Sequence, residues 1–111
     1  MKLNESEVEV GYVYLTSANQ YRAVLAMKGE FMIYAPSVEG MTRIDFSQKS
    51  ESMPFENQPF KKCQISTFAK KDYQVFDFDG TGNEAIKHRL NESQFAQVIR
   101  QCNAQSAIDA L

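Results

Sequence analysis

The hydrophobic pattern of residues 8–35 predicts three antiparallel strands. Apolar runs at about 8–15, 21–27 and 31–35 are rich in β-branched and aromatic residues, and short polar turns separate them. Such runs, bounded by Asn, Ser and Gly, are typical of strands. Two consecutive short turns connect antiparallel neighbours. We therefore expect a meander, on which the rest of the chain is laid.

This meander carries apolar side chains on both faces. Alternate residues of a strand point to opposite faces, so Tyr12 and Tyr14 share one face of the first strand, while Val13 and Leu15 share the other. The third run, 31–35, contains no polar residue at all. An antiparallel sheet with one wet face alternates apolar and polar residues. We therefore expect the second face to be covered by a helix, a second sheet, another subunit or a ligand.

Further strands follow from the alternation of apolar and polar residues in the middle of the chain. They are expected at about 41–47, 60–68, 73–78 and 85–90. Residues 79–83, which begin with Asp-Gly, join the last two as a hairpin turn, because Asp-Gly supplies the positive φ angles that a tight turn requires.

The long polar segment 48–59 contains two prolines, and it holds Met53 and Phe55. Long irregular loops are often functional, which makes these two side chains candidates for binding. The alternative, which we favour, is a crossing loop whose Phe55 closes the edge of the core, because aromatic residues in loops are commonly anchored.

The period becomes helical after residue 90. Asn91 is a good N-cap, and Gln94 completes a capping box. Side chains at helical spacing then form one apolar stripe; they are Phe95, Val98, Ile99 and Cys102, with Ser106 in line. Ile108 and Leu111 fall off this stripe, so we expect the helix to bend or end near Asn103. Whether the tail 104–111 docks on its own chain or on another is left open.

The predicted fold class is α+β: a strongly bent antiparallel sheet, or small barrel or sandwich, of six to seven strands with one C-terminal helix. Residues 1–111 form a single domain, and 1–7 are a polar lead-in. This order resembles the pleckstrin-homology-like superfold, in residues 11–15, in residues 21–25 and in the helix from Asn91. The resemblance implies a bent seven-stranded sandwich closed at one end by the helix. The chain has no Trp, and the turn 16–20 lacks the basic residues with which such domains grip inositol phosphates.

Composition narrows the function classes. A chain of 111 residues with 43% hydrophobic residues builds one core without disulfides or metal. The net charge is −2 and no basic cluster exceeds two residues, which argues against nucleic-acid binding. No signal-peptide pattern is present, and no apolar run approaches the ~18 residues that span a bilayer. We expect a soluble, cytoplasmic protein without a membrane partner, in which Cys63 and Cys102 are buried thiols.

Two sequence motifs overlap at residues 77–82. Residues 77–81 read D-x-D-G-T, the signature of haloacid-dehalogenase-type phosphatases, but no βαβ alternation surrounds them and too little chain follows for the other catalytic loops. The same stretch resembles the start of an EF-hand calcium loop, in which Asp77 and Asp79 would be ligands. His88 stands where that loop needs a bidentate Glu. We therefore interpret the stretch as a hairpin turn with solvated carboxylates, and we expect no cofactor.

His88 is the only histidine of the chain, and it lies between Ile86 and Leu90 on the apolar face of its predicted strand. A catalytic interpretation would make it a general base. No Ser, Cys or Asp is placed beside it by the sequence. We therefore favour a partly buried histidine with one hydrogen bond, or one at the margin of the sheet.

The aromatic residues of the meander are the main candidates for binding, since Tyr and Met are enriched at interfaces. They are Tyr12, Tyr14, Tyr21, Phe31, Met32 and Tyr34. They either line the core or form a contact surface. The leading prediction is a non-enzymatic interaction module that binds a protein partner, or a second copy as a homodimer, through this face. The alternative is a protein that binds a small molecule, or a small enzyme, with a pocket between sheet and helix that involves His88 or Asp77.

Overall fold

The computed structural model describes residues 1–40, 55 and 59–111. The strands are β1 (Tyr12–Thr16), β2 (Tyr21–Lys28), β3 (Phe31–Pro36), β4 (Lys61–Gln64), β5 (Tyr73–Gln74) and β6 (Lys87–Arg89). The helices are the 3-10 turn η1 (Glu5–Glu7) and the α-helices α1 (Ile65–Ala69), α2 (Glu92–Cys102) and α3 (Gln105–Ala110). The strand predicted at 41–47 and the candidate Met53 lie outside the described residues.

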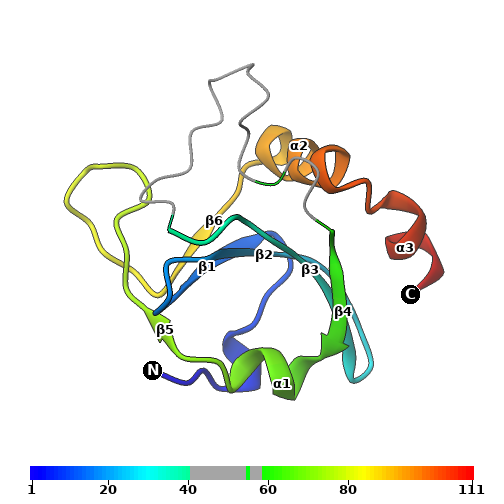
Figure 1. The fold of residues 1–111 in the computed structure, drawn as a ribbon, viewed down its shortest axis with the longest axis horizontal. Helices are drawn as coiled ribbons and strands as arrows, with labels where there is room; N and C mark the ends of the chain where they lie inside the picture. The colour runs from blue at the N-terminus through cyan, green and yellow to red at the C-terminus, as the bar shows by residue number, and fades with distance from the viewer. Residues whose placement is uncertain (41–54, 56–58) are drawn as a thin grey trace.

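The strands form one curled antiparallel sheet, in the order β4-β3-β2-β1-β5, and β6 also pairs with β1. Figure 1 shows this sheet arching over α1 as a half-barrel. A register shift between Val24 and Ala26 marks a bulge in β2, and bulges bend the strand that carries them. The predicted α+β class with a strongly bent antiparallel sheet is confirmed, as is the β1–β2–β3 meander.

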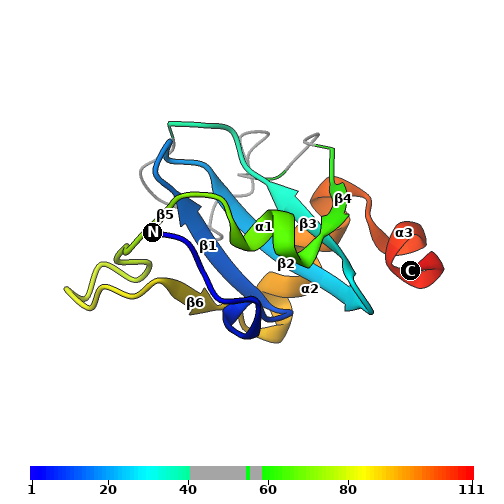
Figure 2. The ribbon, with the colours of Figure 1, turned by 90° about the horizontal axis from the view of Figure 1, so that it is seen from below.

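Both faces of the sheet are covered by the chain itself. On one face Val13 and Leu15 belong to a buried cluster with Val98 of α2. On the other face Tyr14 belongs to a second cluster with Phe68 of α1. Figures 1 and 2 show α2 on one side of the sheet, and α1 with the N-terminal segment on the other. The expectation that something must cover the second face is confirmed, and the cover is α1 together with residues 1–8.

The strand predicted at 60–68 is wrong in its second half. Lys61–Gln64 pair with β3 as β4, but residues 65–69 form the helix α1. The buried side chains of α1 are Ile65, Phe68 and Ala69. Their spacing of three and four residues is helical. A helix of five residues is too short for this spacing to repeat, so the strand-like alternation of residues 60–64 dominated the sequence pattern.

The first strand is also shorter than predicted, because it begins at Tyr12 rather than at residue 8. Residues 5–7 form η1, and Gly11 turns the chain with φ +86°. The segment 1–7 is more than a polar lead-in, since Leu3 is buried against the second face and its N–H donates to the carbonyl of Ala69.

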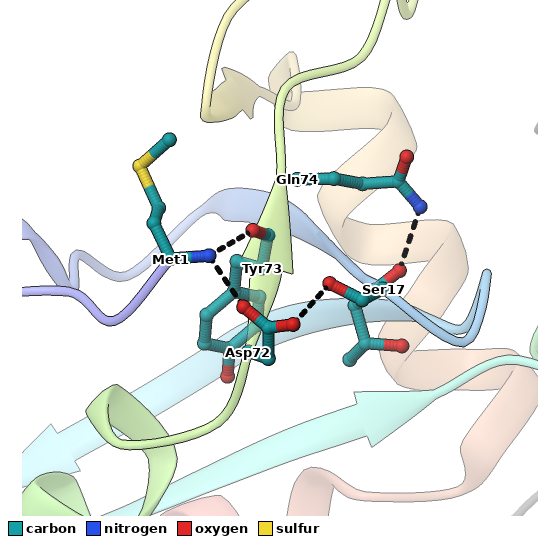
Figure 3. Close-up of polar contacts among 6 residues, drawn as sticks. Met1, Ser17, Asp72, Tyr73 and Gln74 are labelled. Carbon is teal, nitrogen blue, oxygen red and sulfur yellow. Dashed lines mark hydrogen bonds and ion pairs between the residues drawn. The ribbon is translucent and has the colours of Figure 1, made fainter.

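The N-terminal segment lies along β5. The carbonyl of Met1 accepts from the Tyr73 N–H, and its α-amino group contacts the Asp72 carboxylate and the Tyr73 carbonyl (Figure 3). Ser17 donates its Oγ–H to the second carboxylate oxygen of Asp72 at 2.8 Å. These hydrogen bonds to the carboxylate lower the pKa of Asp72 below its usual range.

The strands predicted at 73–78 and 85–90 are shorter in the structure. Only residues 73–74 and 87–89 form β5 and β6, and an isolated bridge joins Phe76 to Ala85. The two strands each pair with β1 rather than with each other. The connection between them is consequently a wide loop and not the tight hairpin that we predicted.

The C-terminal helix is confirmed with its predicted ends. Asn91 accepts a hydrogen bond from the backbone of Gln94, and the capping box is complete. Asn103 ends α2 in the left-handed conformation, at φ 56°. The tail forms the additional helix α3, and Ile108 and Leu111 pack against the first buried cluster. The tail therefore docks on its own chain.

Candidate binding grooves beside helix α2

The aromatic candidates of the sheet are mostly core residues. Those that are buried are Tyr14, Tyr21, Met32, Tyr34 and Phe55. Phe55, which we expected to close the edge of the core, belongs to the cluster beneath α2, and its N–H donates to the Gln101 side chain at 3.2 Å. The binding role of these residues stays a prediction. Their burial removes the exposed aromatic patch that it required.

Two of the buried tyrosines have structural partners. The Tyr14 hydroxyl donates to the Glu7 carbonyl at 2.6 Å and accepts from the Glu9 N–H at 3.0 Å. The Arg22 guanidinium lies 4.8 Å from the centre of the Tyr34 ring. Burial raises the pKa of both tyrosine hydroxyls, and Tyr14 is the more strongly shifted. Tyr14 therefore fixes the N-terminal segment to the sheet.

The two candidates with exposed surface, Tyr12 and Phe31, lie under lysine side chains. Lys87 Nζ is 4.9 Å from the centre of the Tyr12 ring and 3.5 Å from the Glu9 carboxylate. Lys62 Nζ is 5.3 Å from the centre of the Phe31 ring, which is 43% exposed. Cations are attracted to aromatic faces by the ring quadrupole, so one face of each ring lies beside a lysine, while Phe31 still exposes part of its surface.

The loop after β5 uses its first carboxylate internally. Asp77 Oδ1 accepts from the N–H groups of Gly80 and Thr81, and Oδ2 accepts from Gly82. Gly80 and Gly82 have positive φ angles of 71° and 86°, which Gly adopts without strain. The D-x-D-G-T-G pattern thus builds a loop closed by its own carboxylate. Among the described residues, no group of three or more His, Cys, Asp and Glu side chains is placed to hold a metal.

His88 lies at the margin of the sheet on β6. Its ring stacks on Phe78 with centroids 4.0 Å apart, and Nε2 is 3.6 Å from the Asp79 carboxylate. The side chain is 30% exposed. His88 is thus partly buried, as expected, and Asp79 is a neighbour that the sequence did not place beside it; the absence of a catalytic role stays a prediction.

Two grooves flank the side chain of Phe95 on α2. The first has a volume of about 520 Å³ and is lined by Val10, Gly11, Arg89, Leu90, Asn91, Glu92 and Phe95. The second has a volume of about 500 Å³ and is lined by Phe95, Ala96, Ile99, Arg100, Asn103 and Gln105. Both have apolar floors and polar or charged rims. Phe95, which both grooves share, is only half-buried.

The grooves lie beside the part of the apolar stripe of α2 that is not fully buried. Val98 and Cys102 face the core and are buried. Phe95 and Ile99 lie at the border of this face and stay half-buried, and Ala96 beside them is exposed. The sequence placed Phe95 and Ile99 on the apolar stripe, and both pack against the first buried cluster as partly buried side chains. Ala96 is a further apolar residue beside this stripe, so the sequence already indicated that the apolar face of the helix is broader than the stripe alone.

No helix in the part of the chain that the structure describes has the length and apolar character needed to cross a membrane. Comparisons of the chain with protein-family models, with curated proteins and with solved structures found no match.

Proposed function

We propose that this chain is a non-enzymatic protein-binding module whose binding surface is formed by the two grooves beside α2. The observation that carries this proposal is a pair of grooves that share the half-buried Phe95 and are lined by apolar residues together with charged ones. Exposed apolar patches with polar rims mark interaction sites. Charge at the rim and apolar surface at the centre are also the usual anatomy of a protein interface.

Phe95 is the expected anchor of this surface. It packs against the first buried cluster and also lines both grooves, so its position is fixed while part of its ring stays open. Rigid aromatic side chains at the centre of a patch contribute most of the binding energy in many interfaces. Val10, which is 45% exposed, extends the apolar floor beyond α2.

The alternative of a small-molecule pocket or enzyme site at His88 or Asp77 has no comparable support. Neither residue lines either groove, and the Asp77 carboxylate accepts three backbone hydrogen bonds within its own loop. A cytoplasmic location belongs to the same proposal. The thiols of Cys63 and Cys102 are free, and burial raises the pKa of both, which suits structural thiols in a reducing compartment.

The test is a selection of random displayed peptides on the immobilised wild-type chain, followed by affinity measurements on two variants. Ala96→Arg places a long side chain in the second groove and keeps a good helix-forming residue at an exposed position. Ala110→Arg makes the same change at an exposed position of α3 that lines neither groove. We expect the selected peptides to lose at least about tenfold in affinity for Ala96→Arg and none for Ala110→Arg.

Peptides that bind the two variants equally would place binding elsewhere and refute the proposal. Failure of a monomeric chain, checked by light scattering, to select any peptide above background would also count against it, whereas a self-associated chain would occupy its own grooves. Circular dichroism of both variants checks that α2 and α3 remain folded, so that a loss of affinity reports on the groove itself.

A further inference from the structure

The face of α2 that borders the grooves has a charge order that is complementary to itself. Glu92 stands at the start of the helix and Arg100 in its last turn, and both are exposed. They lie eight residues apart, about 12 Å along the axis at a rise of 1.5 Å per residue. Ala96 lies midway between them, with Phe95 and Ile99 beside it on the same face.

We propose that the occupant of the grooves is a second copy of this chain, whose α2 lies antiparallel across the first. A two-fold axis beside Ala96 places Glu92 of each copy opposite Arg100 of the other. This inference rests on the proposed function of the grooves and names its partner. The two ion pairs are related by the axis, as they must be in an isologous interface.

The side chains at the centre of this arrangement suit a close helix pair. Ala96 is small, which lets the two axes approach to the 8–10 Å typical of packed helices. Phe95 and Ile99 then supply apolar contacts on both sides of the axis. Antiparallel helices also set the positive end of each dipole beside the negative end of the other. Arg89 of β6 is exposed and also lines the first groove.

The experiment is a charge reversal read by sedimentation and light scattering over a dilution series that reaches about 1 mM, the weak end of specific association. Wild type is expected to dimerise. Glu92→Arg and Arg100→Glu each replace two attractive pairs by two repulsive ones, which weakens the dimer by about tenfold or more. Mixing the two variants restores both pairs, and we expect a heterodimer that forms more tightly than either variant alone. Glu30→Arg, an equal change of charge at an exposed turn, is the control.

The mixing step separates pairing from helix stability. Each single reversal opposes the helix dipole and weakens α2 within its own chain, and mixing cannot repair such a defect. A double variant, which combines Glu92→Arg and Arg100→Glu in one chain, carries both unfavourable charge–dipole interactions. It nevertheless restores both intermolecular ion pairs. A structural effect therefore makes the double variant the weakest dimer, whereas the proposed pairing returns it close to wild type.

A wild-type chain that stays monomeric throughout the series would overturn the inference, as would a dimer that neither reversal nor mixing changes. The proposed function is judged separately by the peptide test. If wild type is monomeric while selected peptides distinguish Ala96→Arg from Ala110→Arg, the grooves bind another protein and only the identity of the partner is wrong. If both experiments fail, both proposals fall together.

Discussion

Replacing Tyr14 with Phe tests the role of this side chain as the clamp of the N-terminal segment. The ring is fully buried, and only the hydroxyl is removed. The Glu7 carbonyl keeps a second donor, Lys87 Nζ at 3.0 Å, but the Glu9 N–H loses the only acceptor that the described residues provide. A lost pair of hydrogen bonds that leaves one partly buried donor unsatisfied costs about 2 kcal/mol.

The assay is urea unfolding of Tyr14→Phe beside Tyr12→Phe. The Tyr12 hydroxyl makes no hydrogen bond among the described residues, so its removal is expected to change the free energy of unfolding by less than about 0.5 kcal/mol. For a domain of this size, the loss predicted for Tyr14→Phe corresponds to a fall of about 10 °C in Tm. Equal effects of the two variants would refute the reasoning. The hydroxyl of Tyr14 would then not hold residues 7–9 on the sheet.

The remaining predictions address other parts of the fold. Phe68→Ala removes the largest buried side chain of α1 and is expected to cost about 3–5 kcal/mol in urea unfolding. Asn103→Ala strains the left-handed end of α2 and should cost about 1 kcal/mol, whereas Asn103→Gly should be close to neutral by the same measurement. Burial raises the pKa of Tyr14 and Tyr73. Their contribution to stability is therefore complete below the ordinary tyrosine pKa, and it is lost as pH rises above about 10. A denaturation midpoint that stays constant into that range would contradict this prediction. Calcium should leave Tm unchanged, because the Asp77 carboxylate is already bound within its loop.

The meander and the C-terminal helix could be predicted because their signals are local. Gly29 and Asn19 allow the positive φ angles at the two turns between the first three strands, and the capping box at Asn91 involves residues only three apart. These interactions form in the same way wherever the segment lies in the fold. The position of the helix end at Asn103 follows from the same kind of local preference.

The helix α1 could not be predicted, because its reason to exist is tertiary. Phe68 makes edge contacts with Tyr14 and Tyr34, at ring centroid distances of 5.5 and 5.2 Å, and these partners lie more than thirty positions earlier in the chain. Five residues without a helix-specific cap carry little helical preference of their own. Packing on the second face of the sheet therefore makes residues 65–69 helical, although their alternating pattern predicts a strand.

Tertiary packing also decides where the aromatic side chains of the meander lie: most of them are buried, and their binding role stays a prediction. The sequence showed that both faces of the meander are apolar, but not which segment covers the second. Leu3 lies in the predicted polar lead-in and Val8 in the predicted first strand, and the structure buries both on the second face. With α1 they pack in one cluster with Tyr14, Met32 and Tyr34, whereas Tyr21 belongs to the cluster on the other face.

Because the chain itself covers both faces of the sheet, the apolar surface beside α2 matters more for our proposal than the sheet does. Of the large apolar side chains that the described residues expose, Met1, Phe31, Val38 and Val75 line neither groove. Single exposed apolar residues are normal on protein surfaces. Val10 is different, because it lines the first groove together with Leu90 and Phe95. Phe95 also lines the second groove. This shared lining, and not the number of aromatic residues, is the reason why we propose α2 as the binding surface in the described part of the chain.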